Sequence, residues 1–94
     1  MKKRGWRDFI TLCRHTHSEQ ELNELFSLLL SFDEQDQLAT RVELLRALLE
    51  GGKPQRTIAA DLQISIAKIT RGSNALKAIS PSLRQYLESE LLVK

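Results

Sequence analysis

The sequence predicts an all-α chain of six helices, on three observations. Apolar side chains recur at helical spacing along most of the 94 residues. No stretch shows the strict apolar–polar alternation that predicts a half-buried strand. Capping residues and glycine or proline breaks separate the apolar stretches at short intervals. Without a low-complexity linker or an internal repeat, the chain is expected to form a single domain over residues 1–94.

The first two helices are expected over residues 3–14 and from Ser18 to about residue 31. The apolar stripe of the first consists of Trp6, Phe9, Ile10 and Cys13. Ser18 and Glu21 have the spacing of a capping box, which marks the start of the second helix. The apolar residues of the second are Leu22, Leu25, Phe26, Leu29 and Leu30. Each helix is therefore expected to pack by one face.

A longer third helix is expected from Asp33, the predicted N-cap, to the pair Gly51–Gly52, where glycine takes the left-handed conformation that ends a helix. Its buried seam is expected to be Leu38, Val42, Leu45 and Leu49, widened by Leu44 and Leu48. Ser80 and Pro81 form an N-cap and first-turn pair that predicts a last helix. The inward residues of this last helix are expected to be Leu83, Tyr86, Leu87 and Leu91.

Residues 55–78 have the spacing of a helix-turn-helix. A helix over about Gln55–Leu62 is expected to turn through residues 63–64 into a second helix capped by Ser65. Apolar residues expected to clasp the two helices are Ile58, Leu62, Ile66 and Ile69, with the small Ala59 at the crossing. A plain helical hairpin within a core is the alternative interpretation.

Charge is unevenly distributed along the chain. Residues 53–77 hold five basic residues and one acidic residue, whereas residues 15–50 hold two basic and eight acidic residues. This segregation favours one surface that faces a polyanion, with solvated helix faces as the bland alternative. The residues predicted to bind double-stranded DNA are Gln55, Arg56, Ser65, Ile66, Ala67, Lys68, Thr70, Asn74 and Lys77. Of these, Ile66, Ala67, Lys68 and Thr70 are expected at base edges, and Gln55, Arg56 and Lys77 at phosphates.

Other classes of protein find little support in the sequence. The single cysteine, Cys13, and the lack of an export signal predict a cytoplasmic protein, and no apolar run approaches the length of a membrane span. Cys13, His15 and His17 are too few for a closed zinc site, so no metal is expected. No nucleophile–base set or phosphate-binding glycine loop predicts an enzyme. A chain this small leaves apolar surface that a second copy would cover, which favours a homodimer.

Three stretches together resemble the tryptophan repressor family over about residues 25–92. They are ITRGSNALK (Ile69–Lys77), LATRV (Leu38–Val42) and SPSLRQYLE in the last predicted helix. The resemblance implies a six-helix, intertwined homodimer. It also implies a repressor of tryptophan biosynthesis genes that binds operator DNA with L-tryptophan as corepressor.

The resemblance further implies a set of L-tryptophan-binding residues, namely Arg41, Arg71, Gly72, Leu28, Leu30, Ser31 and Leu45. Arg41 and Arg71 match the arginines that sandwich the indole ring, and Arg71 also matches the partner of the carboxylate. Leu28 and Leu30 match positions whose carbonyls receive the ammonium, and Ser31 stands where a threonine is usual. Gly72 would let the ring approach the backbone, although close helix packing explains a glycine equally well.

Two positions depart from the family pattern. Ala75 stands where a serine hydroxyl often helps to bind the ammonium, and Lys68 stands where a threonine is usual. The first substitution removes a hydrogen bond and the second adds a cation near the DNA-reading helix. They leave open a regulator of the same fold that responds to a different effector or to none. A helical protein-interaction module, using the leucine-rich second and third helices, is the alternative from another class.

Overall fold

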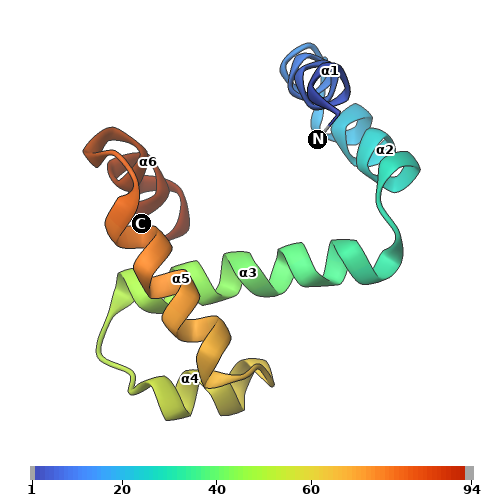
Figure 1. Cartoon of the computed structure of the whole chain (residues 1–94). Coiled ribbons are helices and arrows are strands. Elements are labelled where there is room, and N and C mark those ends of the chain that lie inside the picture. Colours follow the sequence, from blue (N-terminus) through green and yellow to red (C-terminus); the bar gives the residue numbers. More distant parts are fainter. Residues whose placement is uncertain (1, 93–94) are drawn as a thin grey trace. The chain divides into compact units, whose positions relative to one another are not determined.

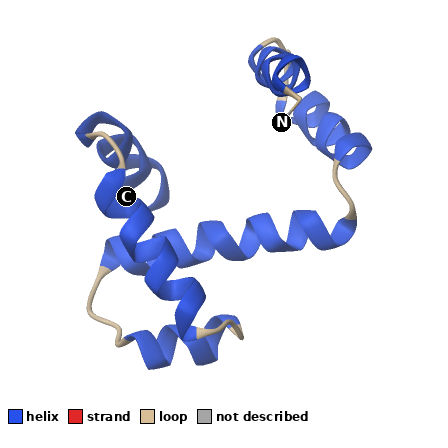
Figure 2. Ribbon diagram, in the orientation of Figure 1, coloured by secondary structure: helices blue, strands red, loops and turns tan. Residues whose placement is uncertain are grey.

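The computed structural model describes residues 2–92, and within that range it consists of six α-helices without a strand (Figures 1 and 2). The helices are α1 (Lys3–Arg14), α2 (Glu19–Leu29), α3 (Phe32–Glu50), α4 (Gln55–Leu62), α5 (Ile66–Ala78) and α6 (Pro81–Leu91). The all-α prediction is confirmed. The chain divides between Asp36 and Gln37 into two compact units, and α3 begins in the first and continues in the second. The expectation of a single domain over residues 1–94 stays a prediction.

Aromatic side chains join α1 to α2 in the first unit. The ring centroids of Trp6 and Phe9 lie 5.5 Å apart, and those of Phe9 and Phe26 lie 6.1 Å apart. Ser18 caps α2 as expected, because its hydroxyl accepts a hydrogen bond from the Glu21 N–H. The Glu21 carboxylate accepts from the N–H of His17, one residue before the cap. The first-turn side chains of α2 thus satisfy backbone donors that the helix itself leaves free.

The start of α3 corrects one prediction. Ser31, not Asp33, caps the helix: its hydroxyl accepts from the Glu34 N–H at 3.1 Å, and the Glu34 carboxylate accepts from the Ser31 N–H at 2.9 Å. This is a reciprocal capping box. Asp33 already lies inside the first turn of α3, where its negative charge interacts favourably with the helix dipole.

The core of the second unit lies where α3, α4 and α5 meet. Leu44, Ile58 and Ile69 form a buried cluster there, in which Ile69 is fully enclosed, and Leu76 of α5 is also buried. The partly buried residues packed against this cluster are Ala47, Leu48, Ala59, Leu62 and Ile64. Figure 1 shows α5 crossing the carboxyl-terminal part of α3. The packing of α4 and α5 on α3 therefore determines which apolar residues of α3 are buried.

This choice overturns part of the expected seam. Leu38 and Val42 are 44% and 41% exposed within the single chain, and the buried residue of α3 is Leu44. In α6, Leu83 and Tyr86 are also exposed, whereas Leu87 and Leu91 are half-buried. For α3, the cause is that α4 and α5 pack on the face that carries Leu44.

Short turns end the long helices as the sequence predicts. Gly51 and Gly52 both have positive φ, at 71° and 85°, a conformation that glycine adopts without a Cβ clash. Ser80 caps α6 and Pro81 opens it. Arg46 Nε donates to the carbonyl of Leu91 at 3.0 Å, which ties the end of α6 to α3. None of the helices within residues 2–92 has the length and apolar character needed to cross a bilayer.

Candidate nucleic-acid interface and ligand-binding residues

The α4–turn–α5 pair is built on a buried clasp. Ile58 of α4 and Ile69 of α5 are 2% and 0% exposed. Between the helices, Gln63 adopts the left-handed conformation and the Ile64 N–H donates to the carbonyl of Ala59 at 3.1 Å. Ile64 turns inward to the core, while Ile66, which the sequence placed in the clasp, is 47% exposed. The prediction of Ile66 as a clasp residue is wrong, because the tight turn brings Ile64 to the core in its place.

The residues predicted to bind DNA lie together on these two helices and their connection. All of them are exposed, namely Gln55, Arg56, Ser65, Ile66, Ala67, Lys68, Thr70, Asn74 and Lys77. Ser65 caps α5, because its hydroxyl accepts from the Lys68 N–H at 3.2 Å. Thr70 donates its hydroxyl to the carbonyl of Ile66 at 3.1 Å. The first turns of α5 therefore offer an open surface whose two hydroxyls are already held by its backbone.

The electrostatics of this pair differ from those of α2 and α3. The first turns of α2 and α3 contain acidic residues, whereas those of α4 and α5 contain none. Asp61, the only acidic residue between Lys53 and Lys77, is 3.2 Å from the ammonium of Lys53. The remaining cations of that segment have no ion-pair partner among residues 2–92; they are Arg56, Lys68, Arg71 and Lys77. The segment therefore carries uncompensated positive charge.

The two arginines expected to hold an indole ring lie on α3 and α5. Arg41 and Arg71 are both exposed, and neither guanidinium forms an ion pair in the described part of the chain. Leu45, one turn beyond Arg41, is half-buried. Both guanidinium groups are thus open to a ligand that carries an aromatic ring or a carboxylate.

Two of the three expected ligand residues of the first unit, Leu30 and Ser31, have local partners. The Ser31 hydroxyl is engaged in the cap of α3, and the Leu30 carbonyl accepts from Gln35 Nε2 at 3.4 Å. Leu28 is 81% exposed. The cap gives the Ser31 hydroxyl a structural role, which the Ser-x-x-Glu spacing of Ser31 and Glu34 indicates.

Gly72 has a packing reason of its own. A Cβ at this position would lie 2.9 Å from Leu44 Cδ2 and 3.7 Å from Leu48 Cδ1. Any side chain on Gly72 would therefore force α5 away from α3 or displace the buried Leu44. Close packing of the two helices accounts for the glycine, whatever else the position does.

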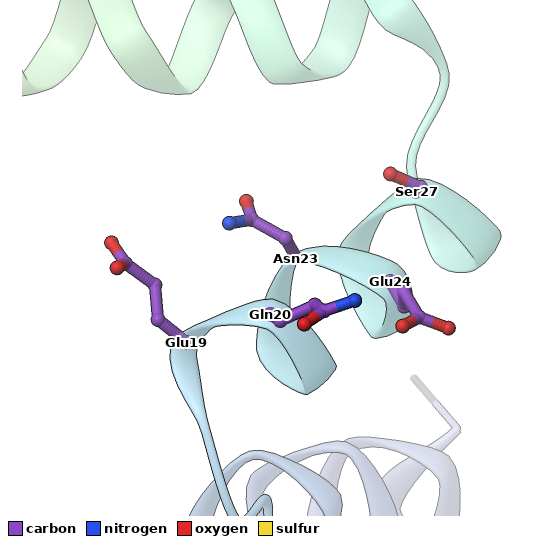
Figure 3. Close-up of a pocket in the computed structure, with 5 residues that line it drawn as sticks. All are labelled: Glu19, Gln20, Asn23, Glu24 and Ser27. Atoms are coloured by element: carbon purple, nitrogen blue, oxygen red, sulfur yellow. The ribbon is translucent and has the colours of Figure 1, made fainter.

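Two hollows of the surface contain none of the predicted ligand residues. One, of about 560 Å³, lies along α2, where Figure 3 shows the side chains that line it: Glu19, Gln20, Asn23, Glu24 and Ser27. The other, of about 110 Å³, lies between α3 and α4 and is lined in part by Glu43, Arg46 and Asp61. The carboxylates of the α2 hollow disfavour a ligand with a carboxylate of its own. Among the described side chains, no three His, Cys, Asp or Glu residues gather as metal ligands.

Known proteins resemble this chain along almost its whole length. A relative from Chlamydia trachomatis serovar D, described as a Trp operon repressor homolog, is 49% identical over 87 residues, which cover 93% of each chain. Homologs with the same description from Chlamydia caviae and Haemophilus influenzae (strain PittEE) are 42% and 34% identical. They match 90% and 92% of this chain and 84% and 85% of their own lengths.

The family model described as Trp repressor protein matches residues 4–91. The match begins in α1, so the likeness extends further toward the amino terminus than the resemblance over residues 25–92. Both the family model and the relatives span α1 to α6 nearly completely. The chain belongs to the Trp repressor family.

Proposed function

We propose that this chain is a dimeric transcriptional repressor that binds operator DNA through a helix-turn-helix formed by α4 and α5, with L-tryptophan as corepressor. One observation carries the proposal. The start of α5 is exposed and free of acidic residues, while the buried Ile58 and Ile69 pack α5 against α4. A helix of this kind fits the major groove with its amino-terminal residues toward the bases. The names of the relatives agree with a regulator rather than an enzyme.

The proposed interface consists of two groups of residues, one that contacts bases and one that contacts phosphates. Ile66, Ala67, Lys68 and Thr70, in the first turns of α5, face base edges, with Ser65 and Asn74 beside them. Gln55 and Arg56 open α4, and Lys77 lies in the last turn of α5, so these three contact phosphates. Base contacts carry sequence preference, whereas phosphate contacts set the position of the protein on the duplex.

L-Tryptophan is the proposed corepressor because Arg41 and Arg71 offer unpaired guanidinium groups on α3 and α5. A guanidinium stacks on an indole face and binds a carboxylate through charge-assisted hydrogen bonds. Leu28, Leu30, Ser31, Leu45 and Gly72 complete the proposed set. A ligand that contacts both α3 and α5 would activate DNA binding by favouring the arrangement of α5 that fits the duplex.

The alternative within the same fold is a repressor that responds to another effector or to none. Lys68 and Ala75 favour it, because they add a cation to α5 and leave a methyl group where a hydroxyl is usual. An additional cation near the duplex raises the affinity of the ligand-free protein for DNA and so reduces its dependence on a ligand. Its test is the same as that of the main proposal.

Operator selection from a pool of random duplexes, with and without millimolar L-tryptophan, tests both the proposed tryptophan-dependent repressor and the alternative with another effector or none. The proposal expects one enriched sequence with two-fold pseudo-symmetry, bound more tightly when L-tryptophan is present. Arg71→Ala is expected to remove the effect of L-tryptophan and its heat of binding in calorimetry. Equal enrichment with and without the amino acid would support the alternative. No enrichment of any duplex under either condition would reject DNA recognition itself.

A further inference from the structure

The exposed residues at the start of α5 differ in how much of their hydrogen-bonding capacity is already used. The Ser65 hydroxyl accepts from the Lys68 N–H, and the Thr70 hydroxyl donates to the Ile66 carbonyl. Ile66 and Ala67 have apolar side chains. The ammonium of Lys68 makes neither a hydrogen bond nor an ion pair within residues 2–92. Lys68 is therefore the residue of this set whose polar group is wholly available to a partner.

The position of Lys68 has no explanation in the stability of the helix. It is the third residue of α5, in the first turn, where the helix dipole disfavours a positive charge. No acidic residue in that turn offsets it, in contrast to α2 and α3. Its side chain is exposed, so it does not pack against the core either. A partner rich in hydrogen-bond acceptors would supply the missing compensation.

Among the bases that the major groove exposes, one matches the hydrogen-bond donors of Lys68 best. Guanine presents two adjacent acceptors, O6 and N7, and lysine is among the side chains that pair with them most often. Adenine places an amino donor beside its N7, cytosine presents a donor, and thymine presents a single acceptor beside a methyl group. An ammonium with three donors and no acceptor is matched best by guanine.

We infer that Lys68 reads a guanine in each half of the operator by direct hydrogen bonds, and that it is the main polar determinant of sequence in α5. The inference rests on the proposed function, because it requires α5 to lie in the major groove. The apolar neighbours Ile66 and Ala67 then contact the base edges beside that guanine without hydrogen bonds. The competing role for Lys68 is a phosphate contact, which carries no sequence preference.

Operator selection with wild-type protein and three variants, in the presence of L-tryptophan, separates these roles. Lys68→Met keeps the length of the stem and removes the donor. It is expected to reduce the preference for guanine at one position of each half-site by about 5- to 150-fold, while the other positions keep theirs. Lys68→Arg is expected to retain the guanine, because arginine binds the same two acceptors. Lys77→Met is the matched control, and should weaken binding to all sequences alike.

Three results would overturn the inference. The first is a wild-type consensus without guanine in the half-site, and the second is an unchanged consensus for Lys68→Met. The third is a uniform loss of affinity for Lys68→Met with a smaller salt dependence, which identifies a phosphate contact. In each case the wild-type protein still selects a sequence, so the proposed function stands. If the wild-type protein selects no DNA sequence, the proposed function is wrong, and the inference about Lys68 is wrong as well.

Discussion

Gly72 lies inside α5, where glycine costs about 1 kcal/mol relative to alanine. A Cβ there would approach Leu44 Cδ2 to 2.9 Å, and Leu44 is only 6% exposed, so its side chain has little room to move. Gly72→Ala is expected to lower the free energy of unfolding by about 1 kcal/mol, because overpacking outweighs the gain in helix propensity. Denaturant unfolding measures the change.

Gly5 provides the matched control for that substitution. It lies in α1, and a Cβ there would meet only Lys2 Cβ, at 4.0 Å. Gly5→Ala is expected to raise the free energy of unfolding by a few tenths to about 1 kcal/mol, since it adds helix propensity without a clash. Equal stabilisation by both substitutions would contradict the packing role of Gly72.

Gln63 holds a left-handed conformation between α4 and α5, with φ 56° and ψ 46°. A residue with a Cβ loses roughly 1 kcal/mol there, and glycine does not. Gln63→Gly is expected to raise the free energy of unfolding by roughly 1 kcal/mol, and with it the unfolding temperature. Gln63→Ala should leave both near their wild-type values. Thermal unfolding followed by circular dichroism distinguishes them. Equal unfolding temperatures for the two variants would show that the strain is absent.

Among the helices, α3 depends on the Ser31–Glu34 capping box. Ser31→Ala removes the acceptor of the Glu34 N–H and is expected to cost about 1 kcal/mol of stability. Ser31→Thr should keep most of it, because a threonine hydroxyl also caps. Ser27→Ala, at an exposed position within α2, is the control and should not destabilise. A stable Ser31→Ala variant that binds L-tryptophan weakly would assign the hydroxyl to the ligand instead.

Helix boundaries could be predicted well because they depend on residues within about four positions of each other. The caps Ser18, Ser65 and Ser80 and the glycine pair at 51–52 all act where the sequence placed them. Capping preference alone does not fix the start of α3, because Ser31 and Asp33 are both good capping residues and stand two positions apart. The reciprocal bonds with Glu34 select Ser31, and Ser18 and Glu21 at the start of α2 have the same spacing.

The covered faces could not be predicted as well, because they depend on contacts between distant segments. Apolar residues lie on several sides of α3, so periodicity alone could not choose Leu44 over Leu38 and Val42. The contact of Leu44 with the position of Gly72 on α5 makes that choice. The residues proposed to bind DNA lie exposed on α4, α5 and their connection, and their role in binding stays a prediction. The ligand set came from resemblance, and its roles stay predictions.

For the molecule as a whole, the exposed apolar residues of α3 favour a dimer. Leu38 and Val42 lie four residues apart on the same side of α3, and both are more than two-fifths exposed. Sedimentation is expected to show a dimer. Thermal unfolding at several protein concentrations should give an unfolding temperature that rises with concentration. The pair of substitutions Leu38→Lys and Val42→Lys should shift it to monomer, and Gln20→Lys, on the polar side of α2, should not. A concentration-independent monomer for the wild type would contradict this expectation.

Four cations of α4 and α5 have no acidic partner among residues 2–92, namely Arg56, Lys68, Arg71 and Lys77. The salt dependence of DNA binding should report how many of them meet phosphate. Lys77→Ala is expected to lower the slope of log affinity against log salt by about one, because one fewer phosphate is neutralised. Lys53→Ala adds the same neutral side chain just before α4, yet the ammonium that it removes already lies 3.2 Å from Asp61 Oδ2. Its slope should therefore stay near that of wild type, and equal decreases for the two variants would mean that the Lys53–Asp61 pair opens when the duplex binds.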